Sequence, residues 1–123
     1  MRRLLVVDDD PAVRELVVAL LTNEPVDVLQ ATSGEEALAL AGRDGEAVDV
    51  VVSDVELPGI CGYETVRRLL ARFPRLESII ISGAAQDAPA HVRATGPSAF
   101  LRKPFERAEL LALVRAALGS TAA

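Results

Sequence analysis

The sequence predicts a three-layer α/β fold, in which a five-stranded parallel sheet is covered by helices on both faces. Two observations lead to this prediction. Short runs rich in Val and Ile, such as residues 50–52 and 79–81, lack the polar alternation of a half-exposed strand and are typical of strands buried on both faces. These runs alternate with segments whose apolar residues recur at helical spacing. Short connections between the two kinds of segment favour right-handed crossovers.

Composition limits the classes of protein to consider. A chain of 123 residues that is 50% hydrophobic can fill one core, so we expect one domain over residues 1–123. The net charge of −5, without a long basic run, argues against direct nucleic acid binding. One cysteine allows no internal disulfide, and the apolar runs are too short to span a membrane, so we expect a soluble cytoplasmic protein.

Cap and turn residues divide the chain into its elements. The strands are predicted at residues 4–7, 26–31, 48–54, 79–81 and 99–102, and the helices at residues 11–22, 34–41, 63–73, 88–95 and 106–118. Pro11 suits the first turn of the first helix, and Pro74 ends the third. Ser33 and Glu36 have the spacing of a capping box, in which each side chain satisfies a free N–H at the helix start.

Three segments give weaker signals. Polar side chains interrupt residues 26–31, so we place this strand at the margin of the sheet. Proline and glycine bracket residues 88–95, which predicts a short or irregular helix. Residues 119–123 are expected to form a frayed tail.

Asp54 stands at the end of the third strand, just before a turn that contains Pro58, Gly59 and Gly62. In open parallel sheets the carboxyl ends of the strands face the crevice where ligands bind, which favours a functional role. A solvated carboxylate in a turn would give the same local pattern. The stretch alone therefore leaves both interpretations open.

Two further carboxylates, Asp8 and Asp9, follow the first strand. If the first and third strands are neighbours, these carboxylates lie close to Asp54 and repel it. Hard oxygen-binding cations relieve such repulsion, and Mg²⁺ commonly takes one or two carboxylates, several waters and a phosphate oxygen. The cluster therefore indicates a Mg²⁺ site linked to phosphate.

Phosphoryl transfer further needs a nucleophile, a hydrogen-bond donor and a cation, which Asp54, Ser82 and Lys103 can supply. Lys103 is the one lysine among thirteen lysines and arginines. A compact ammonium at a strand end is suited to a point contact with phosphate, although chance alone would also explain a single lysine. Pro104 raises the expectation of a cis peptide between Lys103 and Pro104, in a tight turn that aims the lysine, although most peptide bonds before proline are trans.

Four motifs along the chain carry a resemblance to a known family. They are VVDDDP, SDVELPGICG, IIISGA and FLRKPF, in that order. Together they resemble the receiver domain of bacterial two-component response regulators, over nearly the whole chain. The resemblance implies a flavodoxin-like fold with the strand order 2-1-3-4-5.

The resemblance also implies a role for individual residues. Asp54 matches the phosphoacceptor, Asp8 and Asp9 match the acidic pair that holds Mg²⁺, and the main-chain carbonyl of Glu56 supplies a further metal contact. Lys103 matches the phosphate-contacting lysine.

Two other positions match the residues that respond to phosphorylation in this family. Ser82 matches the switch hydroxyl, and Phe100 matches an aromatic rotamer switch. After phosphorylation, the Ser82 hydroxyl would form a hydrogen bond with the phosphoryl group, and Phe100 would turn inward. These movements would change the face around the fourth and fifth helices. The output partner is not identified by the sequence.

The implied activity is transfer of a phosphoryl group to Asp54 from a sensor histidine kinase or a phosphotransfer protein, with Mg²⁺ as the cofactor. We expect no other enzyme activity than the chain's own phosphorylation and dephosphorylation. The main alternative is a receiver-like interaction module that signals without phosphorylation. A metal-dependent phosphohydrolase is disfavoured, because Glu56 stands where such enzymes carry a second Asp.

Some positions depart from the usual pattern of the family. Cys61 stands where an Asp is frequent, and we interpret it as an inert loop thiol. Glu56 and Ala84 flank the site where the family tunes the lifetime of its phosphoryl group. His91 is interpreted as an exposed residue without a ligand role. Because residues 87–98 disfavour a full-length fourth helix, we expect a monomer or a weak dimer.

Overall fold

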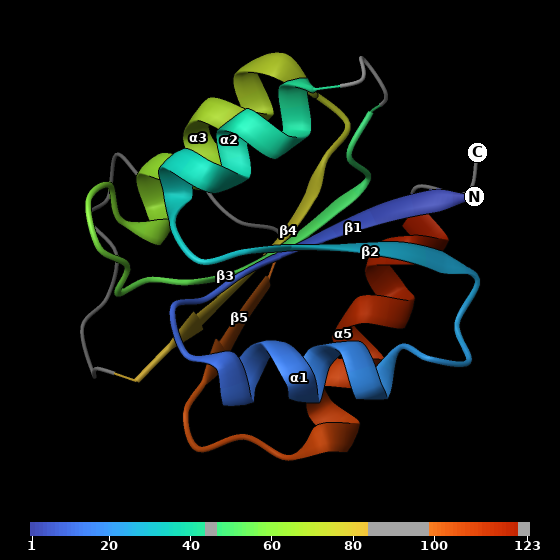
Figure 1. The fold of residues 1–123 in the computed structure, drawn as a ribbon. Coiled ribbons are helices and arrows are strands. Elements are labelled where there is room, and N and C mark those ends of the chain that lie inside the picture. The colour runs from blue at the N-terminus through green and yellow to red at the C-terminus, as the bar shows by residue number, and fades with distance from the viewer. Residues whose placement is uncertain (44–46, 84–98, 121–123) are drawn as a thin grey trace.

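Five parallel strands form the centre of the protein in the computed structural model, which describes residues 1–43, 47–83 and 99–120 (Figure 1). The strands are β1 (Arg2–Val7), β2 (Val26–Ala31), β3 (Val50–Asp54), β4 (Glu77–Ser82) and β5 (Ala99–Arg102). Their order in the sheet is β2-β1-β3-β4-β5, and every neighbouring pair is parallel. The implied strand order is confirmed, and β2 lies at one edge as predicted.

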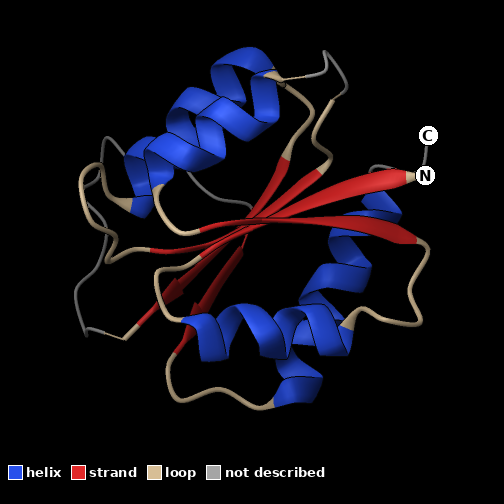
Figure 2. Ribbon diagram, viewed as in Figure 1, coloured by secondary structure: helices blue, strands red, loops and turns tan. Residues whose placement is uncertain are grey.

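Helices cover both faces of this sheet (Figure 2). The described helices are α1 (Pro11–Leu20), α2 (Gly34–Gly42), α3 (Gly62–Arg72) and α5 (Arg107–Ser120). Helices α1 and α5 lie on one face, and α2 and α3 lie on the other (Figure 1). The three-layer prediction is confirmed, whereas the helix predicted at residues 88–95 and His91 lie outside the described residues.

Alternate residues of each central strand supply two separate cores. In β1, Leu4 and Val6 belong to the core under α1 and α5, whereas Leu5 and Val7 belong to the core under α2 and α3. All four side chains are at most 1% exposed. Because successive side chains of a strand point to opposite faces, a strand covered on both faces must be apolar throughout. The uninterrupted apolar runs in the sequence have this cause.

Local capping fixes where two of the helices begin. Asp10 is the N-cap of α1 and accepts a hydrogen bond from the Ala12 N–H, at 2.9 Å. At the start of α2, the Ser33 hydroxyl accepts from the Glu36 N–H, and the Glu36 carboxylate accepts from the Thr32 N–H. The capping box is therefore confirmed, with the carboxylate reaching one residue further back than the usual pattern.

The observed boundaries lie within two residues of the predicted ones, and the differences at the third strand and the last helix bear on the prediction most. The third strand begins at Val50 and not at residue 48, although the Asp49 N–H donates to the Arg3 carbonyl at 2.9 Å and the Asp49 carboxylate accepts from the Arg3 N–H at 2.8 Å. The last helix continues through Gly119 and Ser120, so the tail predicted from residue 119 was wrong for these two residues. Residues 121–123 lie outside the described part of the chain.

Candidate functional site

The carboxyl ends of β1 and β3 bring three carboxylates together. These strands are neighbours, and Val7 lies opposite Ser53, so Asp8 and Asp54 follow at the same level of the sheet. Asp9 lies in the loop after β1. One carboxylate oxygen from each of Asp8, Asp9 and Asp54 lies within 4.8 Å of the other two. The predicted clustering of these residues is therefore observed.

Asp8 is the most buried member of this cluster, with 1% of its surface exposed. Its Oδ1 accepts a hydrogen bond from the Asp10 N–H at 2.9 Å, while its Oδ2 is buried without a partner among the described residues. Burial is the main cause that raises the pKa of Asp8 to about 6, and the charges of Asp54 and Asp9 add to it. The Asp10 N–H and the Lys103 ammonium act in the opposite direction.

A divalent cation fits this arrangement. A buried carboxylate oxygen without a partner costs free energy, and so do like charges at close range. A cation bound between the three carboxylates would satisfy the free oxygen of Asp8 and neutralise the repulsion. The donor set consists of oxygens alone, which suits Mg²⁺ rather than a thiophilic metal.

Asp54 is buried, and each of its carboxylate oxygens accepts one hydrogen bond. Oδ1 accepts from the Glu56 N–H at 3.1 Å, and Oδ2 accepts from the Lys103 ammonium, also at 3.1 Å. Burial alone would lower the pKa of Lys103, but the hydrogen bond to Asp54 and the charges of Asp54, Asp8 and Asp10 raise it. Lys103 therefore stays charged beside Asp54.

The ends of β4 and β5 position Lys103. Its main-chain N–H donates to the Ser82 carbonyl at 2.8 Å, and the Lys103–Pro104 peptide is cis, as Pro104 led us to expect. An open cleft lies at this edge of the sheet. Its lining residues are Asp8, Asp9, Asp10, Asp54, Val55, Glu56, Leu57, Pro58, Cys61 and Lys103.

Ser82 and Phe100 are not among the residues that line this cleft. Ser82 ends β4 and lies opposite Arg102 in the sheet. Phe100 is 48% exposed, and its ring centroid lies 6.2 Å from that of Tyr63 on α3. The structure thus places both residues on the strands that end beside the cleft, with the Phe100 ring facing outward.

Two residues near the cleft have roles that were not predicted from the sequence. Asp10 both lines the cleft and caps α1, a double role that the spacing of Asp10 before Pro11 could have indicated. The Arg14 guanidinium donates to the carbonyl of Asp8 at 2.6 Å and so fixes the main chain of the acidic loop. Arg14 lies one helical turn after Asp10, but its partner depends on how α1 lies against the loop.

Comparison with known proteins identifies the family of the chain. The family model of the response regulator receiver domain matches residues 4–115. The chain is a receiver domain. Receiver domains are the phosphoaccepting modules of two-component signalling, and they receive their phosphoryl groups from histidine kinases.

Relatives of this receiver domain include longer proteins. The chain is 40% identical over 121 residues to the transcriptional regulatory protein FixJ of Azorhizobium caulinodans, covering 95% of this chain and 55% of that protein. It is 38% identical over 112 residues to the sensor kinase CckA of Brucella abortus, covering 90% of this chain and 12% of that protein. The receiver domain thus spans about half, or much less, of these relatives.

Solved structures agree with the fold of this receiver domain. The crystal structure of a response regulator receiver domain from Clostridium thermocellum superposes with a TM-score of 0.85 at 26% identity, covering 97% of this chain and 95% of that one. Among the described residues, no helix is both long enough and apolar enough to cross a bilayer.

Proposed function

We propose that Asp54 is the phosphoacceptor of this receiver domain. The observation that carries the proposal is the contact of 3.1 Å between the Lys103 ammonium and Asp54 Oδ2, made beside the cluster of three carboxylates. A nucleophilic carboxylate, a fixed cation and a site suited to a divalent metal are the parts that phosphoryl transfer to a carboxylate requires. Asp54 also lines the open cleft, where a phosphodonor can reach it.

Asp8, Asp9, Asp54 and the main-chain carbonyl of Glu56 are the residues that we propose to hold Mg²⁺. The free Oδ2 of Asp8 supports this proposal, since it is a buried ligand atom with no other partner among the described residues. When bound, Mg²⁺ neutralises the negative charge that gathers on the phosphoryl oxygens during transfer.

The proposed reaction is an in-line displacement by the Asp54 carboxylate. One oxygen of Asp54 forms a bond to the phosphorus of a phosphohistidine, the phosphorus–nitrogen bond breaks, and the electron pair returns to the imidazole, which takes up a proton. The Lys103 ammonium then exchanges its contact with Asp54 for one with a phosphoryl oxygen. The main-chain N–H of Glu56 keeps the Asp54 carboxylate oriented during the attack.

Ser82 and Phe100 are proposed to carry the response. The Ser82 hydroxyl would donate to the new phosphoryl group, and the Phe100 ring would turn from its exposed position toward the space left by Ser82. The output is a change of the surface around β5, which an output partner reads.

We propose further that the donor is a sensor histidine kinase or a phosphotransfer protein and that the domain acts in the cytoplasm as a monomer or a weak dimer. Its only chemistry would be its own phosphorylation and dephosphorylation. Residues 87–98, on which the expected oligomeric state depends, lie outside the described part of the chain.

The test is incubation with a small phosphodonor and Mg²⁺, followed by mass spectrometry. We expect one phosphoryl adduct, stable to acid and labile to base, which disappears in Asp54→Asn. Asp27→Asn removes the same charge from an exposed position on β2 and should keep the adduct. No adduct on the native protein would favour the alternative of an interaction module, and an adduct that survives Asp54→Asn would place the phosphoryl group elsewhere.

A further inference from the structure

The loop of residues 55–61, between β3 and α3, forms one wall of the cleft. Half of the residues that line the cleft belong to it, Glu56 among them. Main-chain hydrogen bonds close its base, since the Val55 N–H donates to the Ile81 carbonyl at 3.0 Å and the Gly62 N–H donates to the Val55 carbonyl at 2.9 Å. The base of the loop is therefore tied to the sheet, and the position of its tip needs another cause.

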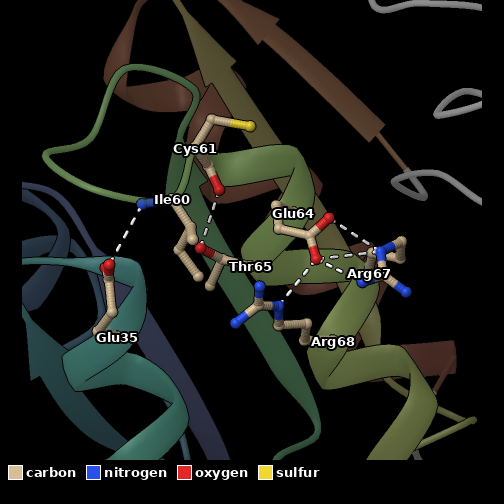
Figure 3. A network of polar contacts seen from close by, with 7 residues as sticks. All are labelled: Glu35, Ile60, Cys61, Glu64, Thr65, Arg67 and Arg68. Carbon is tan, nitrogen blue, oxygen red and sulfur yellow. Dashed lines mark hydrogen bonds and ion pairs between the residues drawn. The ribbon is translucent and has the colours of Figure 1, made fainter.

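The N-terminus of α2 holds this tip. The Glu35 carboxylate accepts a hydrogen bond from the Ile60 N–H at 3.3 Å (Figure 3). Gly59 has a φ of +79°, and a Cβ on it would overlap the Glu35 carboxylate. The positive φ and the missing side chain of Gly59 together let Glu35 reach the Ile60 N–H.

The packing around this contact is equally close. A Cβ on Gly34, beside Glu35, would overlap the hydroxyl of Thr65 and the side chain of Ile60. That hydroxyl donates to the Cys61 carbonyl at 2.9 Å, at the other end of the loop tip (Figure 3). The first turn of α2 and the first turn of α3 thus enclose residues 60 and 61 from two sides.

Glu35 and its neighbour Glu36 serve different purposes. The Glu36 carboxylate is engaged with the Thr32 N–H at 2.9 Å, in the capping box of its own helix. Glu35 points to the loop instead, as Figure 3 shows. Glu35, which the cap of α2 does not use, therefore supplies the hydrogen-bond acceptor for the loop.

We infer that Glu35 is a positioning residue for the cleft, which acts by holding the loop of residues 55–61 against α2. The inference rests on the proposed function, in which this loop carries the Glu56 carbonyl to the metal. Residues that orient metal ligands from outside the ligand shell typically change metal affinity by about 10–100-fold when they are lost. Because Glu35 makes one exposed contact to the loop tip, we expect the lower end of this range.

The experiment compares Mg²⁺ binding by isothermal titration calorimetry with the rate of phosphorylation by a small phosphodonor. Glu35→Ala should weaken Mg²⁺ binding by about 10-fold, while saturating Mg²⁺ should restore most of the phosphorylation rate. Glu35→Gln keeps an acceptor oxygen for the Ile60 N–H and should bind Mg²⁺ within about 2-fold of the native protein. Glu15→Ala removes an exposed carboxylate from α1 and should bind like the native protein.

Each outcome decides the inference. Native-like Mg²⁺ binding by Glu35→Ala would overturn it, even if the variant unfolds at a lower temperature, because a merely structural contact would change only the stability. Equal weakening in Glu35→Ala and Glu35→Gln would also overturn it, since the lost charge and not the loop contact would then be the cause. Failure of the proposed function looks different, because the native protein itself would then bind no Mg²⁺ and accept no phosphoryl group.

Discussion

Replacement of Asp8 by asparagine should stabilise the metal-free protein. At neutral pH the native protein carries a buried carboxylate whose Oδ2 has no partner and whose neighbours repel it. Asparagine has nearly the same shape, keeps an oxygen to accept the Asp10 N–H and carries no charge. The substitution removes the cost of the charge and leaves the rest of the site in place.

The pKa of Asp8 sets the size of this effect. It stands at about 6 in place of the ordinary 3.8, and each pKa unit is worth about 1.4 kcal/mol, so ionising Asp8 costs the folded protein about 3 kcal/mol. For a domain of 123 residues this corresponds to roughly 10 °C in the melting temperature. We expect Asp8→Asn to melt higher than the native protein by that amount at pH 7.5 in a metal chelator.

The pH dependence follows from the sign of the shift. Between pH 4 and 6 the folded native protein holds its Asp8 proton more tightly than the unfolded chain, so native stability falls as the pH rises through that range. The advantage of Asp8→Asn should be small at pH 4 and complete above pH 6. The reasoning would be refuted if Asp8→Asn were stabilised equally at pH 4 and pH 7.5. It would also be refuted if, in chelator at pH 7.5, the native protein melted at a higher temperature than Asp8→Asn.

Saturating magnesium should cancel most of this stability difference. A ligand that binds only the folded state stabilises it by about 2.7 kcal/mol at a hundred times its dissociation constant. Saturating Mg²⁺ should raise the melting temperature of the native protein and leave that of Asp8→Asn nearly unchanged. Asp27→Asn, on the exposed edge of β2, is the control and should respond to Mg²⁺ as the native protein does.

Three further predictions concern the lysine, the loop and the core. Lys103→Arg should lower the rate of phosphorylation by a small phosphodonor about 100-fold, because a planar guanidinium cannot reproduce the point contact with Asp54, and a native-like rate would contradict this. Gly62→Ala should cost about 1–3 kcal/mol in urea unfolding, since its Cβ would overlap the Asp54 carbonyl, whereas Gly119→Ala, with open space around it, should be neutral or stabilising. Leu69→Ala should cost about 2–5 kcal/mol in the same measurement, because Leu69 is fully buried between α3 and the sheet, and a loss below 1 kcal/mol would refute that packing.

The elements of the fold were predictable because their signals are local. The Val50–Val52 run is apolar because both faces of β3 are covered, and Ser33 with Glu36 marks the start of α2 through contacts made within four residues. The order of the strands was not a local property. That β1 pairs with β3 and β2 depends on contacts between distant segments, so the order followed from the family resemblance.

The same distinction explains the site. Asp54 is the last residue of its strand, and Asp8 and Lys103 directly follow theirs. The carboxyl ends of parallel strands lie at one edge of the sheet, so the grouping of these residues followed once the strands were assigned. Arg14 and Glu35 lie on helices, and each contacts a loop. Arg14 contacts the loop that precedes its own helix, and Glu35 contacts a loop 25 residues further along the chain. Their partners depend on how the helices pack, which no spacing in the sequence reports.

The cost at Asp8 bears on how the site works. Natural domains have a net free energy of unfolding of about 5–15 kcal/mol. The ionised Asp8 carboxylate, which costs about 3 kcal/mol, therefore offsets a large share of that free energy for one side chain. The apolar runs of β1 and β3, buried on both faces, supply the stability that allows this charge to persist at their ends. A site in which the carboxylates were well paired would be more stable, but it would offer a cation no free oxygen and no repulsion to relieve. The proposed phosphoryl group would add negative charge beside the same buried oxygen, so the metal would be needed most in the phosphorylated state, and loss of metal should destabilise that state more than the unmodified one.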